Sequence, residues 1–111
     1  MPDSVRPEFV RVAAVSDLAP GKVMEVKANG QTIALCNVDG VFYAVDNVCI
    51  HRGGPLGQGY MEGHMVECPW HGWQFDCRTG KMGSIAGMEI PTYEVKIEGE
   101  DVLVAVRVHP A

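Results

Sequence analysis

Two short segments of this sequence each place a cysteine and a histidine close together. The first is Cys49-Ile50-His51, and the second, 16 residues further on, is Cys68-Pro69-Trp70-His71. Thiolate sulfur and imidazole nitrogen are donors that proteins offer to zinc and to iron–sulfur clusters. Each segment therefore supplies one donor of each kind, and the two together make a four-ligand set.

The pairing of unlike donors within each segment separates two kinds of metal site. Zinc sites most often pair like ligands, as C-x₂₋₄-C or H-x₃₋₅-H. Mixed segments instead let both loops give a thiolate to one iron and an imidazole to the other iron of a two-iron cluster. The pattern favours an iron–sulfur site and leaves a zinc-stabilised interaction module as an alternative.

The residues around these donors resemble the two cluster-binding boxes of Rieske proteins. The boxes read CIHRGGPL from Cys49 and CPWHGW from Cys68, and Gly80 follows the second box. They are most similar to those of the bacterial Rieske ferredoxins that serve ring-hydroxylating oxygenases. The resemblance implies a [2Fe–2S] cluster with Cys49 and Cys68 on the inner iron, and with His51 and His71 on the outer iron near the surface.

The sequence departs from the respiratory branch of that family at four positions. Respiratory Rieske proteins join the boxes by a disulfide, whereas this chain has Gly54 and Trp70 where those cysteines would fall. They also carry a serine and a tyrosine that hydrogen-bond near the sulfurs, whereas this chain has Trp73 and Phe75. Fewer hydrogen bonds to sulfur stabilise the reduced cluster less, so we expect a low potential of roughly −150 to 0 mV.

The remaining cysteines and histidines fit structural or surface roles better than metal binding. Cys36 falls in an apolar strand, and we expect both Cys36 and Cys77 to pack as small apolar side chains. His64 fits a hairpin turn, and His109 lies in the tail. Rieske oxygenases also need a mononuclear iron held by two histidines and a carboxylate, and these two histidines are 45 residues apart. The chain is therefore not expected to be the oxygenase itself.

Composition indicates one ordinary globular domain. The 111 residues carry a net charge of −5, which argues against nucleic acid and against an anionic membrane surface. No stretch is apolar enough for a transmembrane helix, and the first residues do not form an export signal. We expect a cytoplasmic protein, in which cysteines near histidines bind metal more readily than they form disulfides.

Apolar and turn residues alternate in a way that is typical of β structure throughout. Asn29-Gly30 and Asp39-Gly40 are strong signals for type I′ hairpin turns, which need positive φ at both central residues. A turn or a single helical turn is expected over 16–21. The predicted strands cover 9–13, 23–28, 31–38, 41–45, 93–98 and 102–106.

These strands predict an all-β fold, in which the two terminal sets pack as an antiparallel β-sandwich. The middle of the chain, 47–79, is rich in glycine and proline, which shape loops. We expect it to form a cluster-binding subdomain within a single Rieske domain over 1–111.

A docking surface is also expected around the outer iron. Electron transfer needs close approach, and redox encounters are small and weak, so a few apolar residues near His51 and His71 would suffice. The expected apolar rim consists of Ile50, Pro55, Leu56, Pro69 and Trp70.

Together these features predict a one-electron carrier that catalyses no reaction on an organic substrate. The family resemblance implies that it passes electrons from a ferredoxin reductase to a terminal ring-hydroxylating oxygenase, and we expect a monomer. The small Rieske-like subunit of an assimilatory nitrite reductase remains an alternative. Many such subunits lack the ligands, so the intact boxes favour the carrier.

Overall fold

The computed structural model describes residues 6–48, 54–70, 72–82 and 89–108. Short antiparallel strands dominate these residues, with two single-turn 3₁₀ helices between them. The elements are β1 (Arg6–Ala14), η1 (Val15–Asp17), β2 (Val23–Ala28), β3 (Gln31–Val38), β4 (Val41–Asp46), η2 (Leu56–Gln58), β5 (Tyr60–Glu62), β6 (Met65–Glu67), β7 (Gln74–Asp76), β8 (Thr92–Tyr93), β9 (Val95–Glu98) and β10 (Asp101–Val108). The all-β fold class predicted from the sequence is confirmed.

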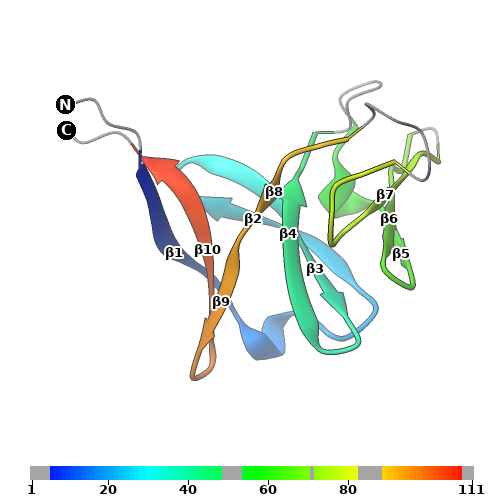
Figure 1. Ribbon diagram of the computed structural model, residues 1–111. Coiled ribbons are helices and arrows are strands. Elements are labelled where there is room, and N and C mark those ends of the chain that lie inside the picture. The colour runs from blue at the N-terminus through cyan, green and yellow to red at the C-terminus, as the bar shows by residue number, and fades with distance from the viewer. Residues whose placement is uncertain (1–5, 49–53, 71, 83–88, 109–111) are drawn as a thin grey trace.

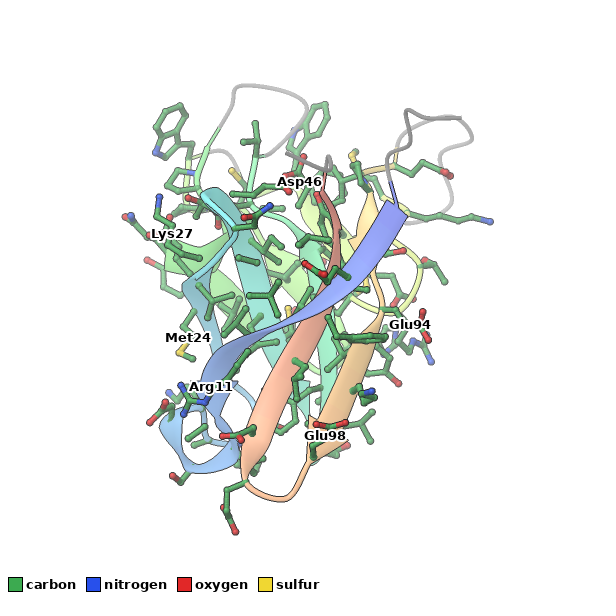
Figure 2. The ribbon with its side chains drawn as sticks, turned by 90° about the vertical axis from the view of Figure 1, so that its left-hand side faces the viewer. Arg11, Met24, Lys27, Asp46, Glu94 and Glu98 are labelled. Atoms are coloured by element: carbon green, nitrogen blue, oxygen red, sulfur yellow. The ribbon has the colours of Figure 1, made fainter. Side chains whose placement is uncertain are left out.

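The strands form three sheets, which follow one another from left to right in Figure 1. One sheet has the order β1-β10-β9, the second has the order β2-β3-β4-β8, and the third has the order β5-β6-β7. Figure 2 looks onto the first sheet, with Arg11 near its β1 side and Glu94 and Glu98 on its β9 side. The first two sheets are the predicted sandwich, and the third sheet falls within 47–79.

The predicted hairpins of the second sheet have the expected turns. Asn29 and Gly30 have φ of 54° and 84°, and Asp39 and Gly40 have φ of 52° and 92°. Positive φ at both central residues is the type I′ geometry that matches the twist of paired strands. The helical turn expected near Ser16 is η1.

The strand predicted over 93–98 is divided at Glu94. Tyr93 pairs with Ala44 in the second sheet, whereas Val95 pairs with Val104 in the first sheet. The carbonyl of Glu94 accepts a hydrogen bond from the amide of Ala105 at 2.9 Å. The prediction of one continuous strand was wrong, because this segment passes from one sheet to the other.

Strand β3 is buried on both faces and separates two apolar cores. Its side chains alternate, as in any strand, so Ile33 and Leu35 enter the core between the first two sheets. Ala34 and Cys36 enter a second core beneath the third sheet. A run of apolar residues without polar alternation is typical of such a strand.

The second core supports the part of the chain that carries the predicted ligand segments. Its buried side chains come from β3, β4, η2, β6, β7, the residues that directly follow β6 and β7, and the segment before β8: Ala34, Cys36, Val45, Leu56, Val66, Cys68, Phe75, Cys77 and Ile90. Within the described residues, no helix is long and apolar enough to cross a membrane. That residues 47–79 form a cluster-binding subdomain stays a prediction.

Candidate metal centre

Cys68 is the predicted ligand that the structure describes. It directly follows β6, its side chain is buried, and its thiol forms no disulfide. The amide of Cys68 donates to the carbonyl of Trp73 at 2.8 Å, and the amide of Gly72 donates to the carbonyl of Cys68 at 3.0 Å. These two backbone bonds close the second ligand segment at its base.

The backbone of Gly54 lies next to the Cys68 sulfur, and there is no room between them for a side chain. A Cβ added at Gly54 would lie 2.6 Å from the Sγ of Cys68 and 3.2 Å from the indole ring of Trp70. Ordinary contacts of this kind are closer to about 3.5–4.0 Å. Only glycine lets the first ligand segment approach the second so closely, and this close approach suits two loops that share one cluster.

The other predicted ligands, Cys49, His51 and His71, lie outside the described residues. Among the residues that are described, no three His, Cys, Asp or Glu side chains gather as a metal site. Cys68 fits a cluster ligand because it is a buried, unbridged thiol at the start of a closed loop.

Cys36 and Cys77 are both buried in the second core, as predicted for packing residues. The Cys77 thiol donates to the sulfur of Met61 at 3.8 Å. A hydrogen bond with Cys77, together with burial, raises the pKa of the Cys36 thiol. The two thiols thus lie next to each other inside an apolar core, as packing side chains would.

His64 lies in the turn between β5 and β6, as predicted. Its ring is partly exposed, and its Nε2 is 3.7 Å from Oδ2 of Asp76. Asp76 accepts hydrogen bonds from Arg78, and these bonds lower the pKa of the Asp76 carboxyl. His109 lies outside the described residues.

The described members of the predicted apolar rim differ in their exposure, and the rim as a docking surface stays a prediction. The Trp70 side chain is exposed at 56%, and Pro55 and Pro69 are half-buried. Leu56 was wrongly included, because it is fully buried in the second core. Ile50 lies outside the described residues.

A buried polar contact next to the first ligand segment was not predicted. Asn47, immediately after β4, is only 7% exposed, and its side chain joins Glu25 to Gly57. An asparagine between the apolar strand β4 and the first cysteine was the available signal. The partner Glu25 is too distant in sequence to be inferred.

Comparison with known proteins decides the family. The Rieske [2Fe-2S] domain model matches residues 8–105, which is most of the chain. The chain belongs to the Rieske [2Fe-2S] domain family. The domain's cofactor is therefore the Rieske cluster, with cysteine and histidine ligands.

Relatives of this Rieske domain include electron-transfer components. The ferredoxin component of the naphthalene 1,2-dioxygenase/salicylate 5-hydroxylase systems of Ralstonia sp. is 41% identical over 96 residues, covering 86% of this chain and 92% of that protein. The ferredoxin of carbazole 1,9a-dioxygenase from Nocardioides aromaticivorans IC177 superposes with a TM-score of 0.80 at 29% identity, covering 86% of this chain and 95% of that one.

A second solved structure contains a ferredoxin together with its oxygenase. It is a complex of reduced oxygenase and oxidised ferredoxin in carbazole 1,9a-dioxygenase, matched at 32% identity with a TM-score of 0.78, covering 87% of this chain and 92% of that one. A putative small subunit of an NADPH nitrite reductase, at 21% identity and a TM-score of 0.73, shares the fold alone with this Rieske domain; the match covers 87% of this chain and 97% of that one.

Proposed function

We propose that this chain is a one-electron carrier that delivers electrons to a terminal aromatic-ring-hydroxylating oxygenase. The observation that carries the proposal is the similarity, over nearly the whole chain, to ferredoxin components of dioxygenase systems. Such a carrier makes and breaks no bond in an organic substrate, so the chain itself is a component of an enzyme system rather than an enzyme.

We propose that Cys49 and Cys68 hold the inner iron and that His51 and His71 hold the outer iron. When bound, the cluster accepts and releases one electron at a time. The burial of Cys68 and the side-chain-free Gly54 beside it support this assignment. The surrounding segment, 47–79, would act as the cluster-binding subdomain.

The side chains around Cys68 favour a low reduction potential. Phe75 is fully buried in the second core and carries no hydroxyl that could donate to a cluster sulfur. Trp73 packs against the same core. Hydrogen bonds to sulfur raise the potential, so hydrocarbon at Phe75 fits a carrier near the low end of the Rieske range.

The proposed partners are a ferredoxin reductase and the oxygenase, docking in turn near His51 and His71 on a cytoplasmic monomer. Trp70 supports this surface, because its large side chain is more than half exposed although it stands two residues from the Cys68 ligand. Large aromatic side chains are common at the centres of interfaces. An exposed indole beside the cluster would bring a partner within electron-transfer distance.

The first test is the visible spectrum of the purified protein, oxidised and after dithionite, with low-temperature EPR of the reduced sample. A red-brown protein that bleaches partly and gives a rhombic signal with average g below two is expected. A colourless protein with stoichiometric zinc would contradict the proposal, and stable co-purification with a sirohaem subunit would indicate a nitrite reductase component.

The docking surface is tested with Trp70→Glu and with Tyr60→Glu as its control. Both side chains are exposed and receive the same charge, but Tyr60 lies on β5. We expect Trp70→Glu to slow electron transfer to the oxygenase about tenfold or more, with an unchanged EPR signal, because aromatic anchors dominate interface energy. Equal slowing by the two variants would argue against a surface centred on Trp70.

A further inference from the structure

The residues on either side of the first ligand segment, 47–48 before it and 55–57 after it, come together at Asn47. The Asn47 carbonyl accepts a hydrogen bond from the Leu56 amide at 2.7 Å, and its side-chain Oδ1 accepts one from the Gly57 amide at 2.7 Å. Val48 and Pro55 form a further β-bridge between these ends. The chain that leaves β4 and the chain that enters η2 are thus joined by backbone and side-chain bonds.

The same asparagine fastens this junction to the sandwich. Its Nδ2 donates to Oε2 of Glu25 on β2 at 2.8 Å, and the other oxygen of Glu25 accepts from Gln58 at 3.3 Å. Gly57 packs against β2 so closely that an added Cβ would be 2.8 Å from the amide nitrogen of Glu25 and would overlap its side chain. The base of the segment is therefore bonded to itself and held against β2.

We propose that Asn47 and Glu25 are positioning residues for the first ligand loop, which hold Cys49 and His51 in place for the cluster; the inference rests on the proposed ligand assignment. Residues 48–55 connect the two bonded ends, so the segment that carries both ligands is short and closed at its base. Partners outside the ligand set commonly orient metal ligands, and their loss costs about 10- to 100-fold in metal affinity or activity.

The chemistry of the pair explains why an asparagine is needed. An amide can accept from Gly57 with its oxygen and donate to Glu25 with its nitrogen at the same time. An aspartate could still accept from Gly57, but it would turn a second carboxylate toward Glu25. Aspartate has nearly the same size as asparagine, so Asn47→Asp mainly removes the hydrogen bond between residue 47 and Glu25.

The test compares Asn47→Asp, Glu25→Gln and the double variant in the cluster-loaded protein. The rate of cluster loss to an iron chelator is followed by absorbance at a temperature well below unfolding, together with the EPR g values of the reduced protein. We expect Asn47→Asp to lose its cluster about tenfold faster and to shift the g values. In the double variant, the new amide at position 25 can donate to the new carboxylate at position 47, so both properties should return to within about threefold of the original.

Asn37→Asp is the matched control. Asn37 is a buried asparagine whose side chain also donates to one group, the Leu18 carbonyl at 2.8 Å, and accepts from another, the Gly40 amide at 2.8 Å. It lies on β3, and both hydrogen-bond partners of its side chain lie outside the ligand segments. We expect Asn37→Asp to lower the unfolding temperature while the rate of cluster loss and the g values stay unchanged.

The possible outcomes separate the two proposals. Equal acceleration by Asn37→Asp and Asn47→Asp, or no recovery in the double variant, would overturn the positioning role. If Asn47→Asp does not fold, Glu25→Ala removes the same bond at its exposed end, and cluster loss at the original rate would then count against the role. A natural protein without any [2Fe–2S] cluster would overturn the proposed function and this inference together.

Discussion

Replacing Gly54 by alanine should weaken the binding of the cluster. Gly54 is buried, and a Cβ there would be 2.6 Å from the Cys68 sulfur. An ordinary contact is about 3.5–4.0 Å, so the sulfur or the Gly54 backbone must move by about 1 Å. Because Cys68 is the proposed inner-iron ligand, that displacement falls directly on a metal–sulfur bond.

The size of the effect follows from the cost of overpacking. Inserting a methyl group into a tightly packed site typically costs about 1–3 kcal/mol, and each 1.4 kcal/mol is a factor of about ten. We therefore expect the cluster to be held about 5- to 150-fold less tightly in Gly54→Ala. Adding Trp70→Ala should not restore it, because the indole is farther from the added Cβ, at 3.2 Å, than the sulfur is.

The assay is cluster content and half-life after reconstitution, with Gly99→Ala as the control. Gly99 has φ of 62° in the β9–β10 turn, and an added Cβ there meets nothing within 4 Å. Alanine at Gly99 should strain the backbone and lower the unfolding temperature, but it should leave the cluster alone. A Gly54→Ala protein with normal cluster content and half-life would refute the steric reasoning.

Two other predictions concern the sulfur atoms and the acid stability. Cys68→Ser should abolish the cluster. Cys36→Ala and Cys77→Ala should keep the cluster spectrum and lower only the stability of the fold, because the thiols of Cys36 and Cys77 lie together in the core. Loss of the cluster in either alanine variant would contradict the ligand assignment. Arg78 lowers the pKa of Asp76, so this contact stabilises the fold above the unfolded carboxyl pKa of about 3.9 and is lost as the pH falls toward the lower folded pKa. Arg78→Gln should therefore raise the midpoint pH of acid unfolding measured by circular dichroism, and an unchanged midpoint would show that the ion pair contributes nothing.

The features that follow from neighbouring residues could be predicted from the sequence. Asn29-Gly30 and Asp39-Gly40 set the hairpin turns through their own backbone preferences, so three strands and their pairing followed directly. The proposed ligand set rests on local information too, because each segment carries a cysteine and a histidine within four residues.

Features that depend on distant residues could not be predicted in the same way. The alternation of apolar residues continues across Glu94, so nothing in that segment shows that its two halves pair with different sheets. Leu56 stands in a loop without periodicity, and only the packing of η2 against the second core shows that it faces inward. The bond between Asn47 and Glu25 joins residues 22 positions apart.

The passage of one strand between two sheets has a practical consequence for measurement. Because β8 and β9 are consecutive parts of one extended segment, the first sheet is tied by a short covalent connection to the sheet that supports the ligand segments. The β9–β10 turn lies well away from the β5–β7 sheet (Figure 1). A fluorophore or an electrode linker attached at the exposed Glu98 would therefore sit on the first sheet, and it would leave the proposed docking surface around Trp70 uncovered.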